Sequence, residues 1–277
     1  MDVRVKLPNG VSMPQLGLGL SHRGGCGYNH DAVVYALKHC GVRLLDTAER
    51  YGNMAKLPAA IQESGVLPDE IFITTKLFPT NYTRVHTAFE DDRRQLNKDT
   101  VDLFLLHTPE CGIGIGNKEL RLQAWRELEM LYDNGQCRAI GVSNFMEKHL
   151  TQLLEECSIK PMANQCEFHP FQTQISLRKF CADEGIVFQG YSPLAKGAVL
   201  HNAIVKEMAN RYNKTEAQVA VRWSLQHGYI TIPKSTNPVR VKENYDVFDF
   251  ELSNDDLEKL AKLHDGRHVS WDPTNVL

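Results

Sequence analysis

The feature that most constrains this fold is a regular alternation of short apolar runs with amphipathic stretches along nearly all 277 residues. Six runs are almost continuously apolar, as expected for strands that are buried on both faces of a sheet. We predict strands over residues 42–48, 71–77, 101–108, 138–143, 162–168, 186–192, 230–235 and 246–250, the last two on weaker patterns. An N-terminal hairpin is predicted from residues 3–6 and the Asn9-Gly10 turn.

The stretches between the runs are predicted to be helices. Residues 31–39, 120–132 and 215–227 carry apolar side chains at helical spacing, and the glycines that can end these helices are Gly41, Gly135 and Gly228. Eight strand-then-helix units with right-handed crossovers close into a (β/α)8 barrel, also called a TIM barrel, of about 250 residues. The sequence therefore predicts an α/β chain in which residues 1–277 form a single barrel domain.

A doubly wound open sheet is the main structural alternative. Such a sheet binds nucleotides through a G-x-G-x-x-G turn that follows an early strand and opens a helix. The segment most like it, Gly-Ile-Gly-Ile-Gly at 112–116, lacks that spacing and follows a His-Thr-Pro sequence typical of a loop. The barrel is the better prediction.

Composition argues against several kinds of partner. The formal net charge is −3 and the basic residues are dispersed, which argues against nucleic-acid binding. No apolar run approaches the roughly 18 residues of a membrane span, and the N-terminus has no apolar signal core. The seven cysteines include no C-x-x-C pair, which favours reduced thiols in a cytoplasmic protein, and no H-E-x-x-H zinc motif occurs, so no metal site is predicted.

Candidate acid–base residues follow three successive predicted strands. The C-terminal ends of parallel barrel strands meet at one mouth. Asp46 and Tyr51 follow the first of these strands, Lys76 ends the second and His107 ends the third. Alone, a strand-end aspartate is usually a cap and a lone histidine usually a core residue, but four such groups at one rim indicate a catalytic site.

These four side chains can divide one reaction among them. A tyrosine has an ordinary pKa of about 10, and a neighbouring lysine ammonium is expected to lower it towards neutral pH. A carboxylate can hold that ammonium in place, and a histidine can hydrogen-bond a substrate carbonyl oxygen. None of the four can deliver electrons, so a hydride must come from a cofactor.

A second cluster lies in the turn after the seventh run. Lys234, Ser235 and Arg240 there combine an ammonium, a hydroxyl and a guanidinium, a set suited to a phosphate monoester. The following helix N-terminus is expected to add backbone N–H donors. A solvated basic turn explains the composition equally well, and the residues alone leave both readings open.

Three separated segments resemble signatures of the aldo-keto reductase family. They are Gly-Val-Arg-Leu-Leu-Asp-Thr-Ala-x-x-Tyr at 41–51, Arg-Ala-Ile-Gly-Val-Ser-Asn-Phe at 138–145, and Ile-Pro-Lys-Ser-x4-Arg-x2-Glu-Asn at 232–244. The resemblance covers essentially the whole chain. It implies a monomeric barrel that reduces aldehydes or ketones with NADPH, and it aligns Asp46, Tyr51, Lys76 and His107 with the catalytic tetrad.

The resemblance also assigns cofactor contacts. It implies that the nicotinamide carboxamide meets Ser143, Asn144 and Gln165, and that its ring stacks on Tyr191. The contacts expected for the remainder of NADPH involve Gly19, Leu20, Ser192, Leu194, Lys196, Lys234, Ser235, Arg240, Glu243 and Asn244.

The substrate pocket departs from the family pattern. Two positions that hold tryptophan in well-studied members appear here as Ser21 and Thr108, whereas Phe78 keeps an aromatic position and His22 lies beside the mouth. Hydroxyls in place of indoles favour a small polar carbonyl substrate, such as a keto sugar, a uronate-type keto-aldehyde or a dicarbonyl. Met54 and Pro58 also depart from the first signature and are expected to alter the start of the helix behind Tyr51.

Two other functions remain open. One is a nucleotide-binding regulatory or structural protein on the same barrel, because a fold alone does not fix a function. The other is a lyase that uses Lys76 as a Schiff-base nucleophile.

Overall fold

The fold is a closed barrel of eight parallel strands. The computed structural model describes residues 3–21, 27–111 and 117–277. The barrel strands, each hydrogen-bonded to the next in this order, are β3 (Leu18–Gly19), β4 (Leu44–Asp46), β5 (Phe72–Leu77), β6 (Leu103–Leu106), β7 (Ile140–Ser143), β8 (Ala163–Glu167), β9 (Val187–Tyr191) and β10 (Ile230–Ile232). A parallel bridge between Leu16 and Thr231, with Gly17 N–H donating to the Thr231 carbonyl at 2.9 Å, joins the last strand to the first.

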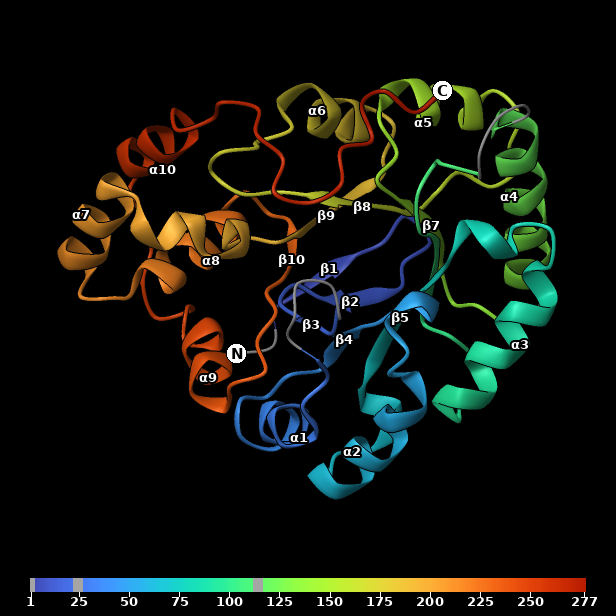
Figure 1. Cartoon of the computed structure of the whole chain (residues 1–277), viewed down its shortest axis with the longest axis horizontal. Helices are drawn as coiled ribbons and strands as arrows, with labels where there is room; N and C mark the ends of the chain where they lie inside the picture. Colours follow the sequence, from blue (N-terminus) through green and yellow to red (C-terminus); the bar gives the residue numbers. More distant parts are fainter. Residues whose placement is uncertain (1–2, 22–26, 112–116) are drawn as a thin grey trace.

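Helices surround the strands in chain order, as Figure 1 shows for α1 to α9. Their bounds are α1 (His30–His39), α2 (Leu57–Ser64), α3 (Val85–Leu96), α4 (Asn117–Asp133), α5 (Glu147–Leu154), α6 (Ile175–Asp183), α7 (Ala203–Tyr212), α8 (Glu216–Gln226), α9 (Pro238–Tyr245) and α10 (Asn254–Ala261). The predicted helices correspond to α1, α4 and α8. Gly41, Gly135 and Gly228 adopt positive φ angles of 71°, 71° and 82° just beyond them, which confirms the predicted stops.

The hairpin of β1 (Arg4–Lys6) and β2 (Ser12–Pro14) covers the N-terminal ends of the barrel strands. Its Leu7 and Met13 are buried in the main core, and Asn9 Nδ2 donates to the Arg138 carbonyl just before β7, at 2.8 Å. The opposite end, where the strands finish, is therefore the end available for a site.

The strands are buried because helices cover their outer face and the interior is filled with side chains. All six residues of β5 are buried, as the continuous apolar run predicts. Gly141 in β7 shows how close the strands pack, because a Cβ atom there would lie 2.5 Å from the Ala163 carbonyl oxygen.

The prediction of a strand at 246–250 is wrong, and β3 takes the place of the eighth strand. The carbonyl of Asp246 accepts from Gln218 Nε2 at 2.6 Å and that of Val247 from Arg222 Nη1 at 3.3 Å, so this segment is tied to the side of α8. Val247 is buried against α8 and Leu16, which explains the apolar pattern without a strand.

Pro58 lies in the first turn of α2, where its missing N–H and fixed φ are tolerated. A 3-10 turn at Met54–Lys56 precedes the helix, and Met54 is buried with its sulfur 3.4 Å from Thr75 Oγ1. Met54 and Pro58 depart from the family pattern, and we expected them to alter the start of this helix. In the structure the 3-10 turn that contains Met54 leads into the helix, and the first turn of the helix contains Pro58.

Candidate active site

The centre of the candidate site is a buried ion pair at the ends of β4 and β5. Lys76 Nζ lies 2.7 Å from Asp46 Oδ1 and donates to the Thr47 carbonyl at 3.0 Å. Burial alone lowers the pKa of Lys76, but the Asp46 carboxylate and Tyr51 outweigh it and raise that pKa, so the lysine is an ammonium. Gln165 Nε2 holds the other oxygen of Asp46 at 2.7 Å.

Tyr51 lies beside this ion pair. It ends a 3-10 turn (Glu49–Tyr51) after β4, and Lys76 Nζ is 5.1 Å from the centroid of its ring. Burial raises the pKa of Tyr51, and the Lys76 charge, with hydrogen bonds from Lys76 and Ser21, lowers it only in part. Lys76 therefore lowers the pKa of Tyr51 as expected, but burial outweighs the lysine, and the pKa of this phenol lies above its ordinary value.

His107 and Phe78 complete an aromatic group around the tyrosine. The rings of Tyr51 and His107 meet edge to face with centroids 5.7 Å apart, and those of Phe78 and His107 at 5.9 Å. Asn144 Nδ2 donates to the His107 carbonyl at 3.0 Å, which fixes the backbone that carries the imidazole. The structure thus brings the four predicted acid–base residues to one end of the barrel.

The residues predicted to bind the carboxamide are linked to one another. Ser143 Oγ donates to the Gln165 carbonyl at 2.8 Å, and Asn144 Nδ2 lies 3.1 Å from Ser143 Oγ. Tyr191 OH donates to Asn144 Oδ1 at 2.8 Å. Asn144 adopts a positive φ of 62°, a conformation that asparagine tolerates better than most residues. This network gathers the ends of β7, β8 and β9 beside the ion pair.

A narrow seam joins the first strand to the predicted phosphate-binding turn. A cavity of about 10 Å³ is lined by Gly19, Leu20, Lys234 and Ser235 together with Gly27, Tyr28, Asn29, Val33 and Thr236. A Cβ atom on Gly19 would lie 3.1 Å from the Ile232 carbonyl and 3.6 Å from Lys234 Cβ, so a side chain there would crowd the turn.

The helix N-terminus after this turn is already capped. Asn237 Oδ1 accepts from Val239 N–H at 2.9 Å and from Arg240 N–H at 3.5 Å. The expectation that these N–H groups are available to a phosphate is wrong, because the Asn237 side chain uses them. Arg240 is exposed on α9, Glu243 is half-buried and Asn244 is buried.

The segment after β9 makes two tight turns over the same side. Ser192 and Lys196 adopt positive φ angles of 55° and 53°, and Gly197 N–H donates to the Leu194 carbonyl at 2.8 Å. Lys196 is exposed and Leu194 is half-buried. These residues follow the C-terminal end of β9, at the same end of the barrel as Tyr51 and Lys76.

The predicted substrate residues separate into different environments. Ser21 lies close enough to Tyr51 to lower the pKa of its phenol, whereas Thr108 is buried and its Oγ1 accepts from Glu110 N–H at 3.3 Å, which folds the loop after β6. The hydroxyl of Thr108 is therefore used inside the protein. His22 and the Gly-Ile-Gly-Ile-Gly segment lie outside the described residues.

One functional side chain was missed by sequence reasoning. The buried Glu167 carboxylate at the end of β8 accepts from His169 Nε2 and His268 Nδ1, both at 3.0 Å, and from Val269 N–H at 2.8 Å. It thereby fastens the segment after α10, here called the C-terminal strap (residues 264–277), to the barrel. The paired acid and histidine in Glu-Phe-His at 167–169 were the available signal.

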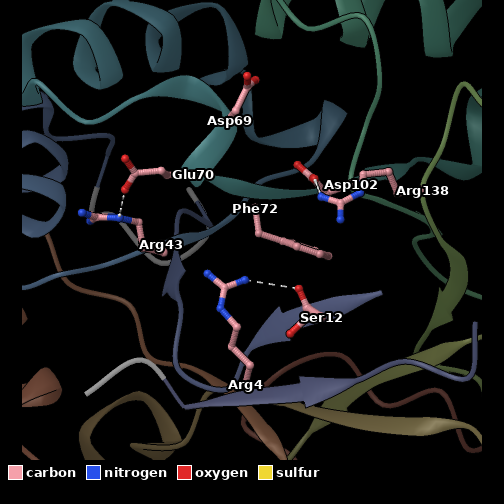
Figure 2. A pocket seen from close by; sticks show the side chains of 8 residues that line it. All are labelled: Arg4, Ser12, Arg43, Asp69, Glu70, Phe72, Asp102 and Arg138. Carbon is pink, nitrogen blue, oxygen red and sulfur yellow. Dashed lines mark hydrogen bonds and ion pairs between the residues drawn. The ribbon is translucent and has the colours of Figure 1, made fainter. Parts of the chain in front are cut away.

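The larger cavity, of about 270 Å³, lies at the N-terminal ends of the barrel strands. Figure 2 shows the side chains that line it. The cavity is lined by Arg4, Ser12, Arg43, Asp69, Glu70, Phe72, Asp102 and Arg138, which belong to the hairpin, begin a barrel strand or precede one. Its guanidiniums bind within the chain, since Arg43 Nε lies 3.2 Å from Glu70 and Arg138 Nη1 2.7 Å from Asp102. This cavity is apart from the candidate active site.

Across residues 3–21, 27–111 and 117–277, we find no group of three His, Cys, Asp or Glu side chains arranged to hold a metal ion. In the same part of the chain, no helix has both the length and the apolar character needed to cross a bilayer.

The fold is a parallel barrel whose C-terminal mouth gathers a buried ion pair, a tyrosine and a histidine. Residues 16–265 match the model of the Aldo/keto reductase family, and the chain belongs to that family. Aldo-keto reductases are oxidoreductases that act on carbonyl groups and use nicotinamide cofactors.

Known relatives are similar over nearly their whole length. The chain is 43% identical over 275 residues to the glyoxal reductase of Bacillus subtilis, covering 99% of this chain and 97% of that protein. It is 39% identical over 275 residues to the methylglyoxal reductase DkgA of Yersinia pestis, covering 99% and 97%. The crystal structure of MGS-M4, an aldo-keto reductase from a deep-sea metagenome library, superposes with a TM-score of 0.90 at 35% identity, covering 99% of both chains.

Proposed function

We propose that this protein is an NADPH-dependent aldehyde or ketone reductase in which Tyr51 donates the proton. The observation that carries the proposal is the buried Lys76–Asp46 pair at 2.7 Å, next to a tyrosine whose ring also meets His107. A buried ion pair is costly to desolvate, so its presence at a barrel mouth favours a chemical role over a stabilising one.

The residues fit a phosphorylated nicotinamide nucleotide. The seam lined by Gly19, Lys234 and Ser235 provides an ammonium and a hydroxyl, and the exposed Arg240 on α9 adds a guanidinium. NADPH, when bound, supplies the hydride that the carbonyl carbon receives. Ser143, Asn144, Gln165 and Tyr191 would hold the nicotinamide, and Leu20, Ser192, Leu194, Lys196, Glu243 and Asn244 would line the remainder of the nucleotide.

Side chains of the protein itself orient the substrate carbonyl and transfer the proton to it. His107 orients the substrate carbonyl oxygen, and the Tyr51 phenol donates its proton as negative charge develops there. The phenolate that remains is stabilised by the Lys76 ammonium and by Ser21, the groups that lower the pKa of Tyr51. Solvent then returns the proton to Tyr51.

The substrate is proposed to be small and polar, such as a dicarbonyl, a keto sugar or a uronate-type keto-aldehyde. Ser21 beside Tyr51 offers a hydroxyl where an apolar wall would favour apolar ligands. Relatives named glyoxal reductase and methylglyoxal reductase support a small dicarbonyl. Phe78 forms the aromatic wall, while Thr108 acts through the loop it folds.

The lyase alternative is disfavoured by the charge state of Lys76. A Schiff base requires a neutral amine, whereas Asp46 and Tyr51 raise the pKa of Lys76. We further propose that residues 1–277 act as one domain, as a cytoplasmic monomer; the six described cysteines are free thiols, in keeping with a reducing compartment.

Nicotinamide oxidation with methylglyoxal tests the proposal. We expect turnover with NADPH well above that with NADH, and Lys234→Met should raise the KM for NADPH about tenfold while changing the KM for NADH little, since a charge-assisted hydrogen bond contributes about 1.5–3 kcal/mol. An equal rise in the KM for both cofactors would show that Lys234 does not bind the 2′-phosphate of NADPH. No oxidation of either cofactor would favour the non-enzymatic alternative.

A further inference from the structure

A positive charge lies at the mouth beside the proposed proton donor. Arg50 immediately precedes Tyr51 in the 3-10 turn and is exposed. Its guanidinium carbon lies 4.4 Å from the centroid of the Phe78 ring. Stacking of a guanidinium on an aromatic face at this distance is an attractive cation–π contact. This contact favours rotamers that keep the Arg50 guanidinium over the Phe78 ring.

The ring that supports Arg50 also contacts the proposed carbonyl-binding residue. The Phe78 and His107 rings meet edge to face at 85°, and the His107 and Tyr51 rings do so at 82°. One aromatic ring thus separates the guanidinium from the imidazole. Arg50 is therefore the chain neighbour of Tyr51 and lies one aromatic ring away from His107.

The neighbouring charged side chains Lys76, Asp46 and Glu49 are held by contacts within the protein. Lys76 and Asp46 neutralise each other. Glu49 Oε2 accepts from Phe78 N–H at 3.1 Å, and Glu49 Oε1 accepts from the Asn81 amide, so this carboxylate fixes the segment that carries Phe78. Arg84 Nε in turn lies 3.2 Å from Asn81 Oδ1 and adds a second cation to the same loop.

We propose that Arg50 selects carbonyl substrates that carry a carboxylate a few bonds from the reacting carbonyl. This inference rests on the proposed carbonyl reductase function and names the substrate class that its site prefers. A guanidinium matches a carboxylate with two parallel N–H donors, and its weak hydration suits a partly exposed mouth. The preferred substrates are therefore small aldehyde acids.

Two aldehydes with the same four-carbon chain test this proposal. Succinic semialdehyde ends in a carboxylate and butanal in a methyl group. We expect the wild-type protein with NADPH to have the higher kcat/KM for succinic semialdehyde. Arg50→Met keeps the length of the side chain and removes its charge, and it should lower the ratio of the two kcat/KM values about tenfold, mainly through KM, because the ground state also binds the carboxylate.

Two further variants separate recognition from general effects. Arg50→Lys should retain part of the ratio, because it keeps the charge without the fork of donors. Arg94→Met removes an equal charge from exposed α3, where Arg94 pairs with Asp91, and should leave the ratio unchanged. Added salt should reduce the wild-type preference, since an exposed charge pair is screened.

Several outcomes would overturn the inference. An unchanged ratio in Arg50→Met would show that the guanidinium does not meet the substrate. An equal fall for both aldehydes would show that Arg50 only supports Phe78 and His107. If the wild-type protein turned over neither aldehyde nor methylglyoxal, the proposed function itself would fail, whereas turnover without charge preference would remove only the role of Arg50.

Discussion

At the scale of single residues, the tyrosine is tuned by opposing effects. Burial raises the pKa of Tyr51, while the Lys76 charge and the hydrogen bonds from Lys76 and Ser21 lower it. A proton donor must be protonated before the reaction, and its conjugate base must be stabilised afterwards. A half-buried phenol with a fixed ammonium beside it satisfies both needs.

Ser21→Ala tests the contribution of the serine. Removing a hydrogen bond that favours the phenolate should raise the pKa of Tyr51 further, and reduction requires the protonated phenol. The alkaline fall of kcat/KM should therefore move to higher pH, by up to about one unit. The pH profile of carbonyl reduction measures this directly. A fall that moves to lower pH, or stays in place, would contradict the hydrogen bond.

Asp92 provides a residue-scale prediction about stability. It is buried on α3, Thr75 Oγ1 donates to its Oδ2 at 3.1 Å, and burial raises its pKa to about 8. The unfolded chain loses this proton near pH 4 and the folded chain near pH 8. The group therefore lowers stability progressively as pH rises from about 4 to 8, with a slope of at most about 1.4 kcal/mol per pH unit.

Asp92→Asn should remove that slope, because an amide cannot ionise. Urea unfolding between pH 5 and pH 8.5 (about the range the linkage requires) should show the wild-type protein losing stability relative to the variant. Asp183→Asn, at an exposed position on α6 that pairs with Lys179, is the matched control and should leave the slope unchanged. A parallel pH dependence of wild type and Asp92→Asn would refute the account.

At the scale of elements, the C-terminal strap depends on one strand end. Burial alone raises the pKa of Glu167, but hydrogen bonds from His169, Val269 and His268 outweigh it and lower the pKa. The stability that Glu167 contributes is therefore present above its ordinary pKa and is lost as pH falls through the lowered value. Ser270 of the strap also hydrogen-bonds Tyr191, so the strap contacts the proposed nicotinamide site.

Glu167→Gln should loosen the strap at neutral pH. The neutral amide cannot replace charge-assisted bonds to two histidines and a backbone N–H, so the local opening free energy should fall by about 2–3 kcal/mol. Hydrogen exchange of the Val269 and Ser270 amides should then speed up by about two orders of magnitude. Glu184→Gln, which removes an exposed pair with Lys160, serves as the control. Equal hydrogen-exchange rates of these amides in Glu167→Gln and Glu184→Gln would contradict the role of Glu167 in holding the C-terminal strap.

At the scale of the whole molecule, strands β4 to β10 were predictable because both of their faces are buried. β3 was not, since Leu18–Gly19 is too short for a pattern and is defined by its pairing to β4 and by the closure bonds to β10. The segment at 246–250 was misassigned because Val247 is buried on the outside of α8. An apolar pattern indicates that a segment is buried, but it does not show whether a strand or a helix covers that segment.

The same distinction applies to the site. Asp46, Lys76 and His107 lie at one mouth because each is at or next to the C-terminal end of a parallel barrel strand. The hydrogen bonds from Gln165 to Asp46 and from His268 to Glu167 join residues more than a hundred positions apart. A local sequence pattern cannot predict such contacts. The capping of α9 by Asn237 was visible in principle, because asparagine before proline is a helix-start signal.

The central claim is that the Tyr51 phenol supplies the proton while the rest of the site binds the cofactor. Turnover of methylglyoxal and the dissociation constant for NADPH, measured side by side for wild type and Tyr51→Phe, test it most directly. The account predicts a fall in kcat of at least about a hundredfold, the typical contribution of a general acid, with NADPH affinity nearly unchanged. Near-normal turnover in Tyr51→Phe would contradict the account.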